Sequence, residues 1–320
     1  MGRAVIEWDM QQEQGGAHLN QMLPFDRAAG VLPFGLRQLA LGMPAEERAA
    51  AEEFRLRSGR ALTVTLPEGE KALSNRLVLS HEDLRTTLEL ATQSSIHTVL
   101  DQVRHGFVTI RGGHRVGLCG TAVVKDGQIC NLREISSLNI RIARQITGIG
   151  EEAVRALKKD GEMPSVLILA PPGAGKTTLL RDMIRCLSDG VCGAAMRVGV
   201  ADERGELGAV WHGVPQLDLG AHTDIMDGCG KSDGLMMLLR GMNPQVIAVD
   251  EITAPEDILA LESAAGCGAK ILATAHGRAA EDLKRRPLYA RMMETRIFQK
   301  VLVLERRGAA RSFRIEVLSP

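Results

Sequence analysis

Two kinds of hydrophobic pattern divide the chain near its middle. Before residue 160, short segments that alternate apolar and polar residues, such as 53–57 and 62–66, are mixed with segments of helical period such as 80–106. After residue 164, short and wholly apolar segments alternate with helical ones, which is typical of a mostly parallel sheet covered on both faces. We therefore predict an α+β N-terminal part followed by an α/β part.

The N-terminal part is predicted to mix helices and hairpins. Ser80 is a candidate helix cap with Asp83 three residues on, and glycine-containing turns are typical of hairpins. The predicted elements are a helix and two strands over 32–66, two helices over 80–106, strands over 107–132, a strand over 137–144 and a helix over 148–161. The polar, Gln-rich start has no such pattern, so we expect a flexible arm there.

The C-terminal part is predicted to contain six strands. They cover 165–170, 196–202, 244–250, 269–275, 300–307 and 312–318. The predicted organisation is an arm over 1–25, a smaller α+β domain over 26–160 and an α/β domain over 161–320.

Composition and charge narrow the range of partners. The 39 basic and 39 acidic residues cancel, and aromatic residues make up 3% of the chain, so nucleic-acid binding is not expected. The six cysteines form no CxxC pair and are expected to be reduced cytoplasmic thiols. No uncharged apolar run of about 18 residues and no secretory signal is present, so any contact with a membrane is expected through a partner.

A glycine-rich loop after the strand at 165–170 predicts a nucleotide site. Residues 169–182 read LAPPGAGKTTLLRD, which has the strand, loop and helix order of a phosphate-binding loop. Lys176 is expected to reach the β- and γ-phosphates of ATP, and Thr177 to ligate Mg²⁺. Ala170 stands where the strict motif has its first glycine. The residues predicted to bind the nucleotide are Pro172, Gly173, Ala174, Gly175, Lys176, Thr177 and Thr178.

Three further strand ends carry candidate catalytic residues. Asp250 and Glu251 follow one strand, Glu203 follows another and His276 follows a third. Because the carboxyl ends of parallel strands meet at one edge of a sheet, all four should line the edge that carries the loop. Asp250 is expected to hold the Mg²⁺ shell. Glu251 and Glu203 both remain candidates for orienting the attacking water.

Taken together, these motifs resemble a known family. EEFRLRSGRAL, GGHRVGLCGTAV, ISSLNIRIAR, PPGAGKTTLLRD, DERGELG, MNPQVIAVDEI and ATAHG, in this order, resemble the ring-forming ATPases of type II and type IV secretion and pilus machines. Within them the chain is most similar to the stage III sporulation protein AA family, from about Leu32 onward. One departure is Asp250, where secretion ATPases often have glycine.

The resemblance implies a function and partners. It implies a RecA-like P-loop ATPase domain that forms a hexamer in the mother-cell cytoplasm. The ring would associate peripherally with membrane proteins of the channel complex between mother cell and forespore. It would hydrolyse ATP to assemble or power that channel. By this resemblance, the functional motifs of the family correspond here to the glycine-rich loop, to Glu203, to Asp250 and Glu251, and to His276.

The resemblance also implies that an arginine of the N-terminal domain completes a neighbouring site. Arg141 and Arg144 are the candidates, and their spacing of three puts them on opposite faces of a straight strand. A surface ion pair is the alternative for either of them. Arg55, Arg57 and Arg60 are expected to form a solvated face or a contact patch.

Two other functions remain open from the sequence. One is a nucleic-acid-directed ATPase of the RecA or AAA+ type, which the adjacent Asp250 and Glu251 would also suit. The other is a nucleotide-gated scaffold that binds ATP with little turnover.

Overall fold

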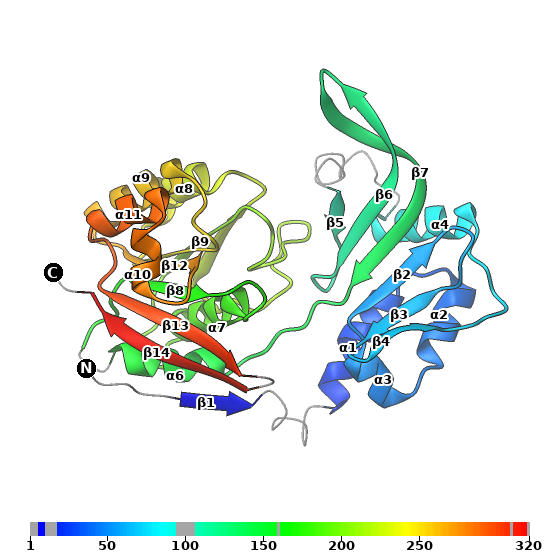
Figure 1. Ribbon diagram of the computed structural model, residues 1–320, viewed down its shortest axis with the longest axis horizontal. Coiled ribbons are helices and arrows are strands. Elements are labelled where there is room, and N and C mark those ends of the chain that lie inside the picture. The colour runs from blue at the N-terminus through cyan, green and yellow to red at the C-terminus, as the bar shows by residue number, and fades with distance from the viewer. Residues whose placement is uncertain (1–5, 10–17, 94–105, 159–160, 308–309, 319–320) are drawn as a thin grey trace. The chain divides into compact units, whose positions relative to one another are not determined.

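The structure is a computed structural model. It describes residues 6–9, 18–93, 106–158, 161–307 and 310–318 (Figure 1). The second of the two helices predicted over 80–106 lies mostly outside these residues. By contacts the chain divides into two compact units. The N-terminal unit comprises residues 13–144 with 209–216, and the C-terminal unit comprises 1–12, 145–208 and 217–320.

The N-terminal unit is a six-stranded antiparallel sheet with four described helices. The strand order is β4-β3-β2-β7-β6-β5. The strands are β2 (Glu53–Arg57), β3 (Thr63–Leu66), β4 (Gly69–Ala72), β5 (Phe107–Thr109), β6 (Arg115–Lys125) and β7 (Gln128–Arg141). The helices are α1 (His18–Ala29), α2 (Phe34–Leu41), α3 (Ala45–Ala50) and α4 (His81–Ala91).

Period-two alternation builds the core of this unit. Phe54 and Leu56 of β2 and Ile140 of β7 are fully buried, while the residues between them face outward. Phe25 of α1 packs against Phe54, with ring centroids 4.9 Å apart. The predicted cap of α4 is present, because Ser80 accepts from the Asp83 amide and the Asp83 carboxylate accepts from the Ser80 amide.

The C-terminal unit is an eight-stranded sheet of order β1-β14-β13-β8-β12-β11-β9-β10. The strands are β1 (Ile6–Asp9), β8 (Val166–Ala170), β9 (Val198–Asp202), β10 (Thr223–Asp227), β11 (Val246–Val249), β12 (Lys270–His276), β13 (Lys300–Arg307) and β14 (Ala310–Val317). The six strands from β13 to β10 are parallel, and β14 and β1 continue the sheet by antiparallel pairing.

Helices cover both faces of this sheet, as the apolar strands require. The described helices are α6 (Ile149–Leu157), α7 (Lys176–Ser188), α8 (Lys231–Met242), α9 (Pro255–Gly266), α10 (Ala280–Lys284) and α11 (Pro287–Glu294). One core contains residues of α6 and α7, and the other contains residues of α8, α9 and α11 (Figure 1).

The start of the chain differs from the sequence-based expectation. An arm without regular structure was predicted over 1–25, but β1 pairs with β14 in the C-terminal unit, with Ile6 opposite Phe313. Helix α1 begins at His18, also within the predicted arm. The chain returns to the C-terminal unit at Gln145, upstream of the expected domain boundary at 160, so α6 belongs to that unit.

Candidate active site

Four parallel strands end at one edge of the C-terminal sheet. Ala170, the last residue of β8, pairs with His276 of β12, and Val249 of β11 pairs with Ala273 of β12 and Ala201 of β9. This register places His276, Asp250 and Asp202 in neighbouring positions beside the glycine-rich loop. The residues predicted from four separate segments therefore converge at this edge.

The glycine-rich loop has the backbone that a phosphate site needs. Gly173 and Gly175 have φ of 70° and 100°, in the left-handed region that favours glycine. Gly175 precedes α7, and no side chain caps the amides at the start of this helix. Uncapped amides at a helix N-terminus bind anions well, so the loop fits a nucleotide phosphate. Ala170 lies inside β8, fully buried, upstream of this turn.

Lys176 is buried between the loop and His276. Its Nζ lies 2.9 Å from His276 Nδ1 and 3.4 Å from the carbonyl oxygens of Ala170 and Pro171. Because an ammonium group only donates, His276 Nδ1 accepts, and Nε2 carries the proton that faces Glu251 Oε1 at 2.8 Å. Burial lowers the pKa of Lys176, and the carboxylates of Asp250 and Glu251 oppose this shift.

Asp250 is the centre of a hydroxyl and carboxylate cluster. Its Oδ2 accepts from Thr177 Oγ1 and its Oδ1 accepts from Thr274 Oγ1, each at 2.7 Å. Thr274 is fully buried and also accepts from the Glu251 amide at 2.8 Å. The Thr177 hydroxyl and the Asp250 carboxylate are oxygen ligands of the kind that Mg²⁺ prefers. Sequence reasoning missed Thr274, although it lies two residues before His276.

Two oxygen ligands suit a metal that is also held by phosphates. In the part of the chain that the structure describes, no group of three His, Cys, Asp or Glu side chains is placed to hold a metal by itself. Mg²⁺ characteristically keeps waters and takes one or two protein ligands together with substrate phosphates. The site therefore fits Mg²⁺ bound with a nucleotide.

Glu251 has both carboxylate oxygens engaged. Oε1 contacts His276, and Oε2 accepts from Arg204 at 3.2 Å. Its backbone has φ of 53°, an unfavourable value for a residue with a side chain. The hydrogen bond from the Glu251 amide to Thr274 Oγ1 helps to hold this conformation. Such strain is concentrated at functional sites.

Asp202 shapes the loop that carries Glu203. It is 2% exposed and accepts from the amides of Glu206, Leu207 and Gly208 at 2.8, 3.0 and 2.8 Å. Burial raises its pKa, and these bonds oppose the shift. Its role is to fold the loop.

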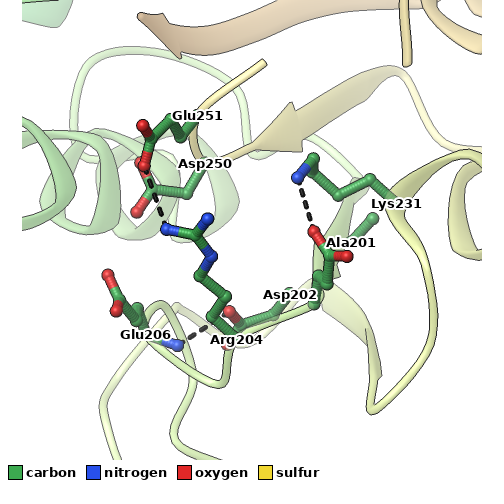
Figure 2. A pocket seen from close by; sticks show the side chains of 8 residues that line it. Ala201, Asp202, Arg204, Glu206, Lys231, Asp250 and Glu251 are labelled. Carbon is green, nitrogen blue, oxygen red and sulfur yellow. Dashed lines mark hydrogen bonds and ion pairs between the residues drawn. The ribbon is translucent and has the colours of Figure 1, made fainter. Parts of the chain in front are cut away.

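Glu203 lines the same pocket as Asp250 and Glu251. Figure 2 shows Asp250 and Glu251 beside Arg204 in this pocket. Glu203 Oε2 accepts from Lys231 Nζ at 2.5 Å. Lys231 was not predicted, because nothing in GCGKSDG distinguishes it from a surface lysine at a helix start.

The two candidate arginines of the N-terminal unit have different surroundings. Arg141 is the exposed last residue of β7, and no partner is found for its side chain among the described residues. Arg144 lies beyond the strand and donates to the Ala49 carbonyl oxygen. Burial lowers the pKa of Arg144. Arg55 and Arg57 form ion pairs with Glu53 and Glu70.

Comparison with solved structures assigns the fold. The pilus retraction motor PilT, solved with bound ADP, matches with a TM-score of 0.60 at 17% identity, over 86% of this chain and 81% of that one. The ATPase DotB of Legionella pneumophila matches with a TM-score of 0.52 at 17% identity, over 80% and 72%. The chain therefore has the P-loop fold of the secretion ATPases, with a RecA-like domain preceded by an α+β part.

Sequence comparison assigns the family within this class. Residues 26–315 match the family described as sporulation stage III, protein AA. Stage III sporulation protein AA of Bacillus subtilis (strain 168) is 38% identical over 279 residues, covering 87% of this chain and 90% of that protein. The chain belongs to the sporulation stage III protein AA family. None of the helices in the described residues is long and apolar enough to span a membrane.

Proposed function

We propose that this chain hydrolyses ATP with Mg²⁺ as part of a homo-oligomeric ring. The observation that carries the proposal is the continuous set of contacts from Thr177 through Asp250 and Thr274 to Glu251, His276 and Lys176. It joins the glycine-rich loop after β8 to the two carboxylates after β11 and to Thr274 and His276 of β12. Membership of a sporulation family and the secretion ATPase fold support the same function.

Each residue has a proposed role in hydrolysis. Amides of residues 172–178 would bind the phosphates. The Lys176 ammonium group would leave His276 Nδ1 and donate to the γ-phosphate instead. Thr177 and Asp250 hold Mg²⁺, which neutralises charge that develops on the phosphate oxygens. His276 and Arg204 keep the Glu251 carboxylate oriented at the edge of the loop.

We propose Glu203 as the residue that orients the attacking water. Both oxygens of Glu251 already accept from a side chain, so neither is free of a protein partner, whereas one oxygen of Glu203 is not engaged by Lys231. Glu203 is engaged through Oε2 by Lys231, its side chain is 43% exposed, and it lines the pocket. Its other oxygen is available to accept a hydrogen bond from a water molecule.

Arg141 is the proposed arginine that completes a neighbouring subunit's site. Its exposed position at the end of β7 leaves the guanidinium available, whereas Arg144 is bound to the Ala49 carbonyl. An arginine acting on the transferring phosphoryl group increases the rate about 10³- to 10⁵-fold. A dilute monomer should therefore hydrolyse ATP slowly.

Phosphate release measured against protein concentration tests this function. We expect the rate per subunit to rise as subunits associate, and Lys176→Ala to remove most of the turnover. A rate per subunit that does not change across the association range would exclude sites shared between subunits. ATP-dependent thermal stabilisation without phosphate release would instead identify a nucleotide-gated scaffold.

The proposed cellular role is to assemble or power a channel complex between mother cell and forespore. The ring would lie in the mother-cell cytoplasm and associate with membrane proteins of that complex. A tagged Glu203→Gln variant, which should retain bound ATP, would be recovered from sporulating cells with its partners. Recovery of no integral membrane protein would contradict the proposed docking.

A further inference from the structure

Lys231 is a buried cation in an unfavourable place. It is the first residue of α8, and its side chain is 4% exposed. A positive charge is disfavoured at a helix N-terminus because the helix dipole is positive there. Burial of an ammonium group adds a desolvation cost unless the group is paired. The surroundings of Lys231 must therefore provide compensating contacts.

Three segments provide those contacts. Lys231 Nζ donates to Glu203 Oε2 at 2.5 Å and to Thr253 Oγ1 at 3.3 Å, and it lies 3.8 Å from Asp257 Oδ2. Asp257 is itself fixed, because its Oδ2 accepts from the amides of Thr253 and Ala254 at 3.0 and 3.1 Å. The Lys231 amine is thus held by Thr253 and Asp257, at the start of α9, and makes one short hydrogen bond to Glu203.

The short bond reaches a partner whose side chain is partly exposed. The Glu203 side chain is 43% exposed, so without Lys231 it could take other rotamers. Lys231 bonds Oε2 and leaves Oε1 unengaged by the amine, in a residue that lines the same pocket as Asp250 and Glu251. A buried and immobile donor is well suited to fixing a carboxylate of this kind.

We infer that Lys231 is a positioning residue, which orients the Glu203 carboxylate for the attacking water. This inference rests on the proposed ATPase function and deepens it. Lys231 contacts neither the loop nor Asp250, so it should affect the chemical step and leave nucleotide binding unchanged. A purely structural ion pair would instead change the stability of the fold without a specific loss of turnover.

A double-mutant cycle between Lys231 and Glu203 tests the inference. Turnover of the full-length chain is measured for the wild type, Lys231→Met, Glu203→Gln and the double variant, with kcat and KM for ATP determined separately. We expect Lys231→Met to lower kcat about 10- to 100-fold with KM within about twofold of the wild type. In the Glu203→Gln background, Lys231→Met should cause no further loss.

Two additional variants serve as controls. Lys270→Met removes an exposed lysine of the same sheet, whose partner Glu162 lies 3.9 Å away, and should leave kcat unchanged. Lys231→Arg keeps the charge with a different geometry, so its kcat should lie between those of the wild type and Lys231→Met. If Lys231→Met does not fold, Lys231→Arg takes its place in the cycle, with the same expected dependence on Glu203.

Two results would overturn the inference. One is a folded Lys231 variant with wild-type kcat. The other is an equal loss of kcat in the presence and absence of the Glu203 carboxylate. In both cases the proposed function would remain supported if the wild type hydrolyses ATP and Lys176→Ala abolishes that activity. A wild-type chain that releases no phosphate would remove the proposed function, and the inference with it.

Discussion

Thr274 links the proposed metal ligand to the strained residue beside it. Replacing Thr274 with Val keeps the shape of the side chain and removes its hydroxyl, so Asp250 loses a donor and the Glu251 amide loses its acceptor. Leaving a buried group unpaired costs about 1–3 kcal/mol.

We expect Thr274→Val to lower the free energy of unfolding by about that amount and to lower kcat as well. Urea denaturation and phosphate release would measure the two effects. Thr295→Val is the control, because Thr295 Oγ1 bonds only the Met292 carbonyl of its own helix. Equal effects of both substitutions would contradict the assigned role.

His114 of the N-terminal unit gives stability a dependence on pH. It is fully buried, and its Nδ1 accepts from the Ala143 amide at 3.0 Å. Burial lowers its pKa from 6.5 to about 4, with a smaller contribution from Arg27. Because the unfolded chain binds the proton more tightly, the neutral imidazole contributes its full stability above about pH 6.5. This contribution is lost as pH falls through about 4.

We expect His114 to account for a loss of about 3 kcal/mol in the stability of this unit across that interval. Trp211, which is assigned to the N-terminal unit, would report unfolding by fluorescence in a Trp8→Phe background. His114→Gln should flatten the dependence on pH. An unchanged slope in that variant would assign the effect to other groups.

At the residue scale, the sequence predicted side chains that lie inside recognisable motifs. Lys176, Thr177, Asp250, Glu251 and His276 were all predicted, and the structure brings them together. Lys231 could not be predicted, because its burial depends on the fold of segments distant in the sequence. The contacts of the Glu251 carboxylate could not be predicted either, because Arg204, which donates to it, follows a different strand.

At the scale of elements, α7 is held against α6 by a glycine. A side chain at Gly150 would lie 2.5 Å from the Met183 amide nitrogen and 2.6 Å from the Asp182 carbonyl carbon. The Gly150 amide also donates to Asp182 Oδ2 at 2.6 Å. Because α7 begins at the phosphate-binding loop, the contact between these helices also supports the loop.

We expect Gly150→Ala to destabilise the fold by about 1–3 kcal/mol through overpacking and to weaken nucleotide binding. Gly241→Ala in α8 is a matched control, because a side chain there would meet nothing within 4 Å. That substitution should stabilise the helix by up to about 1 kcal/mol. Thermal unfolding and nucleotide titration would measure both variants. The prediction requires that Gly150→Ala lowers the stability and that Gly241→Ala raises it.

Elements were predictable where burial leaves a clear period. The mostly apolar strands β8, β9 and β11 lie within the predicted segments, and β12 extends one residue beyond its segment. Strand β4 is exposed at all four positions and β10 is nowhere fully buried, so neither has an apolar pattern, and both were missed. The single helix predicted before β2 is in fact two, α2 and α3, separated at Gly42–Pro44.

At the scale of the whole molecule, the proposed sharing of a site between subunits would allow two inactive variants to complement each other. Lys176→Ala removes the nucleotide lysine of a subunit's own site, and Arg141→Ala would remove the arginine that the subunit offers to its neighbour. Neither variant alone should turn over ATP at the normal rate. Mixed rings would contain interfaces with both residues intact, about a quarter of the total for random mixing of a ring with equivalent interfaces.

We therefore expect phosphate release to recover on mixing the two variants. Arg144→Ala is the control: because Arg144 is not proposed to act in a neighbouring site, mixing it with Lys176→Ala should produce no such recovery. The absence of any recovery in mixed oligomers would contradict a role of Arg141 in a neighbouring site. The family resemblance suggested this role, and no contact within one chain could establish it.

The pairing of β1 with β14 has a consequence during biosynthesis. The ribosome releases residues 6–9 long before residues 310–317, so the edge of the C-terminal sheet can close only when translation is nearly complete. Until then β1 lacks its partner strand, and an unpaired strand edge is prone to join another chain. Variants that lack the first ten residues leave the outer edge of β14 unpaired and should therefore be more prone to aggregation.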